Sequence, residues 1–273
     1  TRFVREVCFG VQPKGIKSED GMTRSTKARF IGTLALACLV QPVDVGAQER
    51  PTGLEVGALP AITFDADEGF GYGALVELYQ YGDGALGPYM WSARPTVFLT
   101  TEGRRDFTLF FDAPHLLPDG WRLDAFLGTE EQIATPYYGV GNASAYDEAL
   151  DLEDGPNPFF YRFGRNRRSA TFNLQRPFGE SKLRGLFGAG FVNTDITDVP
   201  EGDGTTLYAG EIVTGEDSEW TNYVRAGLVW DSRDRETGTR SGAWTEFLFQ
   251  RVDEQFGADR SYSRWTFTDR RYL

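Results

Sequence analysis

Hydrophobic and polar residues alternate along much of this chain, most clearly between residues 221 and 250. The first arm of this segment has an apolar face made of Val224, Ala226, Leu228 and Trp230. A turn rich in charge, Thr and Gly follows, with the sequence SRDRETGTRSG. The second arm sets Thr245, Phe247 and Phe249 against Trp244, Glu246 and Gln250. A period of two indicates strands with two chemically different sides, so the segment is predicted to be a β-hairpin.

The same alternation predicts eight further strands, at residues 60–64, 70–81, 89–100, 107–111, 121–128, 161–177, 182–194 and 261–272. No amphipathic helix is predicted that could cover the apolar faces of these ten strands, and no run of 18 apolar residues predicts a spanning helix. Lipid is the solvent that fits such a face. We therefore predict an all-β fold, an antiparallel transmembrane β-barrel.

The predicted connections differ in length, with long polar loops at 135–158 and 195–220 and a short turn at 178–181. Outer-membrane barrels place short turns in the periplasm and long loops outside, and a first strand running outward puts both long loops outside. Ten strands that end at Leu273 leave an open edge, which lipid does not tolerate. We therefore expect a fragment of a larger barrel, with a complete ten-stranded barrel as the alternative.

The N-terminal part is predicted to lie outside the barrel. Residues 1–21 are interpreted as a leader upstream of a start at Met22. Residues 22–47 combine basic residues, the apolar run 30–40 and the small-residue site Val45-Gly46-Ala47, as in a secretory signal peptide. Residues 48–57 are predicted to be a periplasmic linker and 58–273 the barrel. Export would place the protein in the outer membrane of a Gram-negative bacterium.

Composition narrows the possible functions. The formal net charge of −12 argues against a nucleic-acid partner. Both cysteines, Cys8 and Cys38, precede the predicted cleavage site, so thiol chemistry is excluded from the mature chain. His115, the only histidine, lies between two prolines in a turn, and no hydrolase motif is found, so we predict no enzyme activity and no cofactor. Acidic residues 147–154 could bind Ca²⁺ weakly, although a solvated loop is the alternative.

Four groups of residues together resemble the BamA/TamA family of outer-membrane assembly proteins, also called bacterial surface antigens. The turn motif comprises Asp231, Arg233, Asp234, Gly238 and Gly242. The opening pattern comprises Pro60, Phe64, Gly69, Gly71 and Gly73. The third is the sequence YYGVGN at 137–142, followed at the end of the chain by residues 262–272. The resemblance spans about residues 58–273 and implies a barrel of sixteen strands, of which about ten would be present as an open half-barrel.

The resemblance implies a function in inserting or translocating outer-membrane proteins, with unfolded clients and periplasmic accessory proteins as partners. Residues 48–59 cannot hold the periplasmic POTRA domains of the family, which puts client recruitment in doubt. The alternative is therefore a passive pore or a structural barrel. In the family the first strand forms a weak seam with the last. The corresponding residues are Pro60, Ile62 and Phe64, in a strand predicted to be short and poorly paired.

Two charged groups are further candidates. Asp231, Arg233 and Asp234 are either ordinary turn residues or an ion-paired periplasmic plug. Arg162, Arg165, Arg167 and Arg168 are predicted either to line the lumen or to contact lipopolysaccharide phosphates near the rim. Outer-membrane lipid and lipopolysaccharide are thus the predicted non-protein partners.

Overall fold

The computed structural model describes residues 51–273 except 66, 142–143, 152–154, 156, 198, 200–205, 212–217 and 237. The predicted leader and signal peptide lie outside the described residues. The strands are β1 Leu54–Asp65, β2 Gly69–Gln80, β3 Trp91–Thr100, β4 Arg105–Ala113, β5 Arg122–Pro136, β6 Arg162–Pro177, β7 Leu183–Thr197, β8 Ser218–Trp220, β9 Tyr223–Asp231, β10 Gly242–Val252 and β11 Tyr262–Tyr272. The helical elements are η1 Glu148–Leu150, α1 Leu207–Glu211 and η2 Glu254–Phe256.

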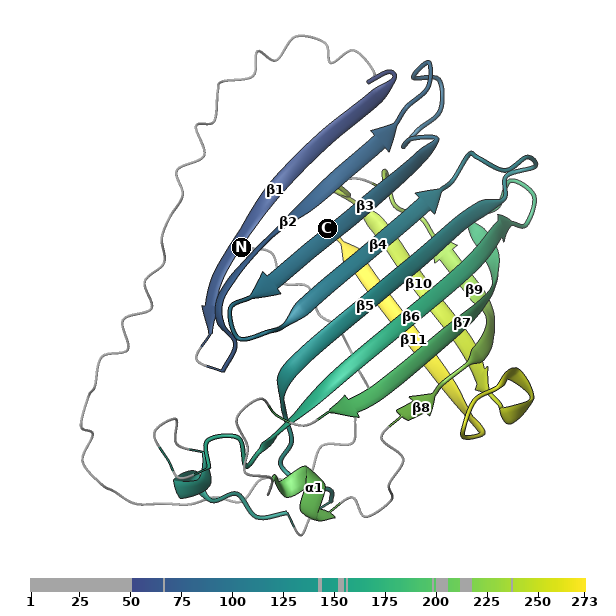
Figure 1. Ribbon diagram of the computed structural model, residues 1–273. Coiled ribbons are helices and arrows are strands. Elements are labelled where there is room, and N and C mark those ends of the chain that lie inside the picture. Colours follow the sequence, from purple (N-terminus) through teal and green to yellow (C-terminus); the bar gives the residue numbers. More distant parts are fainter. Residues whose placement is uncertain are drawn as a thin grey trace. The chain divides into compact units, whose positions relative to one another are not determined.

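All strands form one antiparallel sheet in which sequence neighbours pair (Figure 1). The order is β1-β2-β3-β4-β5-β6-β7-β9-β10-β11, and the short β8 pairs only with β7. Within the described residues the sheet is not closed, and β1 and β11 form its two edges. The predicted all-β antiparallel architecture is confirmed, with the ten expected strands and β8 as an addition inside the predicted 195–220 loop.

The predicted start of the first strand is wrong. β1 begins at Leu54 rather than Pro60, so residues 54–57 of the predicted linker belong to the sheet. β1 pairs with β2 without interruption from Leu54↔Gln80 to Asp65↔Gly69, so the expected short, poorly paired strand is also wrong. Pro60 is predicted as the first residue of the strand, because proline commonly begins strands. It is also tolerated within an edge strand, as it is here.

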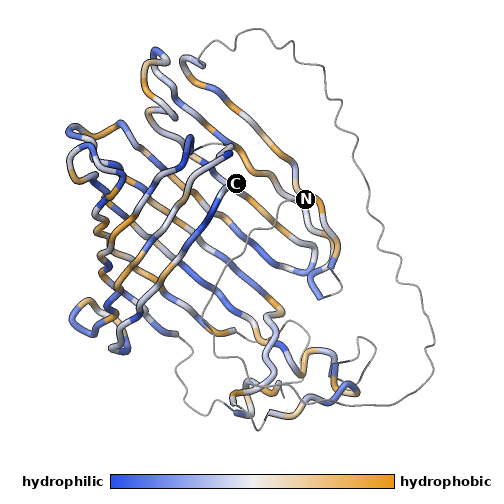
Figure 2. The backbone as a smooth tube through the Cα atoms, turned by 180° about the vertical axis from the view of Figure 1, so that it is seen from behind, coloured by the Kyte–Doolittle hydropathy of each residue, from blue (hydrophilic) through white to orange (hydrophobic). Residues whose placement is uncertain are grey.

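Apolar side chains form continuous rows across one face of the sheet, which we call the outer face. One row, matched strand by strand, consists of Ala93, Phe111, Ala125, Phe172, Ala189 and Val224. A second row consists of Leu123, Leu174, Phe187, Ala226, Phe249 and Trp265. Figure 2 shows the alternation of hydrophobic and hydrophilic residues along the strands that produces these rows. The faces predicted for 223–231 and 244–250 are confirmed.

The opposite, inner face carries polar residues in the same register. One row crosses eight strands and consists of Ser92, Asp112, Asp124, Asn173, Gly188, Arg225, Gln250 and Arg264. Among the described residues, two small apolar clusters interrupt this polar face, Leu186–Val229–Leu248 and Val192–Tyr223–Val252–Ala258. Because Glu130 of β5 and Arg264 of β11 line one hollow, the sheet curls around its inner face. Figure 1 shows β9, β10 and β11 passing behind β4, β5 and β6.

Among the described residues, no helix combines the length and the apolar character needed to cross a membrane.

Close backbone approach at Gly73 gives the first prediction. A Cβ at Gly73 would lie 2.1 Å from the carbonyl oxygen of Val97, whereas at Gly57 the nearest atom would be 4.0 Å away. We expect Gly73→Ala to lower the free energy of unfolding by about 1–3 kcal/mol, because β2 and β3 must separate. Gly57→Ala is the matched control and should change it by less than about 0.5 kcal/mol. Urea unfolding in detergent micelles, followed by tryptophan fluorescence, measures both; equal effects would contradict the prediction.

Candidate functional site

The turn motif predicted from the sequence lies at the connection between β9 and β10, which we call the 232–241 turn and which the structure describes except for residue 237. Arg233 donates from Nε and NH2 to the two carboxylate oxygens of Asp231, both at 2.9 Å. The same guanidinium lies over the ring of Trp244, 4.6 Å from its centroid. A two-point ion pair stacked on an indole is a well-oriented arrangement for arginine. The expected ion pair between Asp231 and Arg233 is therefore present.

Asp234 does not take the position expected for it in an ion-paired plug. Its Oδ1 accepts backbone N–H groups from Arg240 at 2.9 Å and Ser241 at 3.1 Å, which holds the two ends of the turn together. These backbone hydrogen bonds lower the pKa of Asp234, because they favour its ionised form. Gly238 and Gly242 have φ of +64° and +104°, and a Cβ at Gly242 would lie 2.2 Å from the carbonyl oxygen of Ser232. Glycine at these positions permits the tight turn.

Glu236 links this turn to the inner face of the sheet. This residue is not among those predicted from the sequence. Glu236 Oε2 accepts a hydrogen bond from NH1 of Arg122 at 2.7 Å. Arg122 also donates from Nε and NH2 to both oxygens of Asp112, each at 2.7 Å. Tyr89 Oη donates to Asp112 Oδ2 at 2.7 Å, and burial raises the pKa of this tyrosine above its usual range. We call these four residues the Arg122 network.

The Arg122 network ties together parts of the chain that are far apart in sequence. Tyr89 belongs to the β2–β3 connection, Asp112 to β4, Arg122 to β5 and Glu236 to the β9–β10 turn. The alternation of residues places Asp112 and Arg122 on the polar face. Nothing in the sequence, however, indicates that Glu236 rather than a neighbouring turn residue reaches them. The network anchors the 232–241 turn against the inner face at the end of the sheet that also carries the short 178–182 connection. We call this the short-turn end, and the opposite end, with the 137–161 loop, the long-loop end.

Two polar hollows lie along the inner face. The first has a volume of about 300 Å³ and lies beside the Arg122 network. It is lined by Asp124, Asn173, Gln175, Arg225 and Glu246 among others. Asn173 bridges this group, since its amide donates to Asp124 and its Oδ1 accepts from Arg225 at 2.7 Å. The second hollow has a volume of about 430 Å³ and includes Glu130, Arg167 and Arg264.

The four candidate arginines of β6 and its start do not form one group. Arg165 donates to Oε1 of Gln132 at 2.6 Å and Arg167 lines the second hollow, so both serve the inner face. Both of their Nε atoms are buried without a hydrogen-bond partner among the described residues. Arg168 lies on the outer face, with a 68% exposed side chain 3.6 Å from Asp195. The lumen alternative thus fits two of the four.

Arg162 instead holds loops together at the long-loop end. Its Nε donates to Asp67 of the β1–β2 turn at 2.8 Å, and NH1 lies 3.1 Å from Asp151. In the same loop, the rings of Tyr138, Tyr146 and Tyr161 pack on one another. Arg162 therefore connects the 137–161 loop to the first hairpin.

The candidate seam residues lie on the outer face of the edge strand β1. Ile62 and Phe64 are 69% and 78% exposed, and Pro60 pairs with Ala74. The backbone edge of β1 that faces away from β2 has no strand partner among the described residues.

The histidine and the acidic run singled out in the sequence make local contacts in the loops. His115 Nε2 lies 2.9 Å from the carbonyl oxygen of Gly87. Asp147 caps η1 through the N–H of Ala149, and Asp151 contacts Arg162, while 152–154 of the acidic run lie outside the described residues. In the described part of the chain, no group of three or more His, Cys, Asp or Glu side chains is arranged to hold a metal.

Comparison of the sequence with protein-family models and with curated proteins gives no match. Among solved structures, the chain is similar to the crystal structure of BamA from Haemophilus ducreyi lacking POTRA domains 1–3. The identity is 13%, the TM-score is 0.43, and the match covers 79% of this chain. The chain spans 36% of the length of that BamA chain.

The Arg122 network gives a second prediction. Asp112 is 2% exposed, so Arg122→Met would leave a buried carboxylate without its cation. We expect the free energy of unfolding to fall by about 3–5 kcal/mol. The matched control is Arg105→Met, which removes an arginine from the exposed pair with Glu131, 3.8 Å apart, and should cost less than about 1 kcal/mol. Urea unfolding in micelles measures both variants, and a comparable loss in the two would show that the network adds nothing.

Proposed function

We propose that this chain is the transmembrane part of an outer-membrane β-barrel that assists the insertion or translocation of other outer-membrane proteins. The observation that carries the membrane part of this proposal is the pair of apolar rows across the outer face, opposite a polar row on the inner face. Phe187 and Trp265 of these rows are 59% and 62% exposed. In water each such side chain would forgo roughly 1.5–3 kcal/mol of burial free energy, whereas lipid supplies an apolar surrounding.

The lengths of the connections support one orientation in the membrane. The 137–161 loop and the connection between β7 and β9 lie at the same end of the sheet as the β1–β2 turn, and the 232–241 turn lies at the other end with the short 178–182 connection. Outer-membrane barrels keep short turns in the periplasm and long loops outside. The Arg122 network would then lie near the periplasm and Arg162 near the cell exterior.

The edge of β1 supports the assembly part of the proposal. Lipid cannot hydrate free backbone groups, so the edges of β1 and β11 require strand partners in a membrane. An incoming strand can satisfy such an edge by adding to the sheet, as in β-augmentation. The motif resemblance, with Asp231, Arg233, Asp234, Gly238 and Gly242 gathered in one turn, is the second support.

A passive pore is the second candidate function. The polar hollows beside Arg225 and Arg167 favour it, because the lining of a water-filled lumen needs charged and amide side chains. On this alternative the edges of β1 and β11 are satisfied within the barrel, and no client chain is involved.

Contact with lipid can be tested at two adjacent positions of β11. In a chain carrying Cys8→Ser and Cys38→Ser, a fluorophore is attached to Trp265→Cys on the outer face or to its matched control Thr266→Cys on the inner face. In liposomes we expect lipid-borne quenchers to act several-fold more strongly at 265, and aqueous iodide to act more strongly at 266. Equal iodide quenching at both positions would refute the membrane proposal.

The assembly function is tested in the same liposomes. We expect the protein to accelerate the folding of an added, unfolded model barrel protein several-fold, compared with liposomes carrying an unrelated folded barrel. Folding is followed by the shift in gel mobility that heating abolishes. No acceleration together with a steady single-channel conductance in planar bilayers would establish the pore instead.

A further inference from the structure

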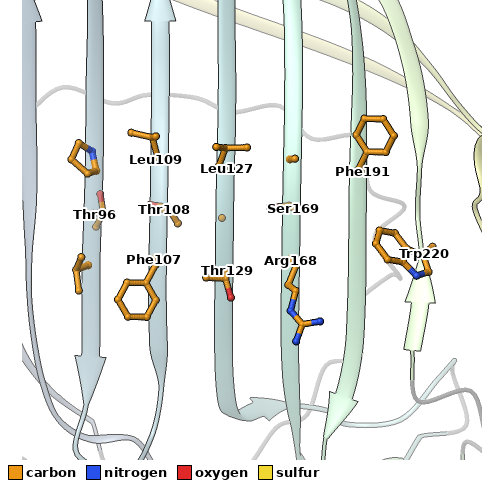
Figure 3. Close-up of a pocket in the computed structure, with 14 residues that line it drawn as sticks. Thr96, Phe107, Thr108, Leu109, Leu127, Thr129, Arg168, Ser169, Phe191 and Trp220 are labelled. Atoms are coloured by element: carbon orange, nitrogen blue, oxygen red, sulfur yellow. The ribbon is translucent and has the colours of Figure 1, made fainter.

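An apolar hollow of about 610 Å³ opens on the outer face over β3 to β8 (Figure 3). It is lined mainly by carbon atoms of the side chains Val97, Phe107, Leu109, Leu127, Phe191 and Trp220. This hollow belongs to the face that the proposed function places in lipid. It is separate from the two polar hollows, which open on the inner face.

The shape of this hollow follows from the strand register. One outer-face row runs through Phe107, Thr129, Arg168, Asn193 and Trp220, and the next runs through Leu109, Leu127, Ala170 and Phe191. Thr129 and Ala170 are short, whereas Phe107, Phe191 and Trp220 are long. Short side chains between long ones leave a depression with a nearly apolar floor, into which an acyl chain fits.

The positively charged side chain of Arg168 lies at one side of the depression. Figure 3 shows Arg168 beside Thr129 on the side of the hollow that lies nearer the long-loop end of the sheet. Its ion pair with Asp195 is 3.6 Å long and its side chain is 68% exposed, so exchange of Asp195 for another anion costs little. In the proposed orientation this side faces the outer leaflet. Trp220 supplies the amphipathic ring that is favoured at such an interface.

A second arginine follows on the same face. Arg105 pairs in register with Glu131, one outer-face row further toward the long loops than Phe107 and Thr129. Its ion pair with Glu131 is also loose, at 3.8 Å, and its side chain is 63% exposed. Two strand spacings and two residues of rise separate Arg105 from Arg168, about 12 Å between their Cα atoms. Two accessible guanidinium groups at this spacing suit a headgroup with two phosphates better than one with a single phosphate.

We propose that this hollow binds a lipid A-type glycolipid, a phosphorylated sugar headgroup with several acyl chains. One acyl chain fills the depression between Phe107 and Phe191, and the two phosphates contact Arg168 and Arg105. The proposal rests on the proposed membrane location. Of the four arginines for which the sequence left the lumen and lipopolysaccharide phosphates open, it assigns phosphate contact to Arg168.

The test measures lipid bound to the folded full-length protein by native mass spectrometry after addition of purified lipid A. The variants are Arg168→Gln, Arg105→Gln and Ala170→Phe, which fills the depression. The matched control is Arg167→Gln, with the same charge change at the next residue but on the inner face. We expect about tenfold weaker binding for Arg168→Gln and for Ala170→Phe, a smaller loss for Arg105→Gln, and no change for Arg167→Gln.

Two further lipids define the chemistry. Dephosphorylated lipid A loses both phosphate contacts, so it should bind the unchanged protein more weakly than lipid A binds Arg168→Gln. Phosphatidylglycerol should bind at least tenfold more weakly than lipid A. Equal binding of lipid A by Arg168→Gln and Arg167→Gln would overturn the proposal, and equal binding of phosphatidylglycerol would make this a general anionic-lipid site. The fluorophore at position 265 distinguishes failure of the glycolipid site from failure of the membrane proposal. If that label contacts lipid and Arg168→Gln has no effect, only the glycolipid site is refuted.

Discussion

The structure depends on one constraint, which is that the two faces of a single sheet require opposite solvents. A strand alternates its side chains between faces, so every strand must place apolar residues in register with those of its neighbours. A slip of one residue in β7 would turn Phe187 inward, and the same slip in β6 would turn Asn173 outward. The apolar row from Leu123 to Trp265 and the polar row from Ser92 to Arg264 are the visible result. The inner face therefore needs its own interactions, which hydrogen-bonded charges provide.

Those charges also organise the short-turn end of the molecule. Arg122 satisfies Asp112 with two hydrogen bonds and donates a third, from NH1, to Glu236, so one side chain fixes both a strand pair and a distant turn. Breaking such a buried pair is costlier than the pair is stabilising, because one charge is left unsatisfied. The stacking of Arg233 on Trp244 holds the start of the same turn. The turn is thus attached at two points, one on β10 and one on β5.

Local pattern was enough to predict most strands and their facing, because alternation and polar turns are properties of neighbouring residues. It failed for β1, where Leu54, Val56 and Ala58 continue the outer-face alternation but the strand is predicted to start at Pro60. It also missed β8, because three residues are too few for a period. Of the candidate site, the Asp231–Arg233 pair lies within three residues and was foreseeable. The bond from Arg122 to Glu236 spans 114 residues and depends on how the sheet curls, which no local pattern contains.

The short strand β8 has a consequence for how copies of the protein avoid one another. β7 extends beyond β9, since the pairing of these two strands reaches only Gly190↔Tyr223 while β7 continues to Thr197. β8 pairs with Asn193 to Asp195 of this overhang. Two hydrogen bonds fasten it to the loop after β10, since the carbonyl of Trp220 accepts from the N–H of Asp259 and the N–H of Trp220 donates to the Asp259 carboxylate. An uncovered overhang would be a template for strand exchange between molecules crowded in one plane. β8 lies on that edge and takes up the pairing positions of Asn193 to Asp195 that such an exchange would need.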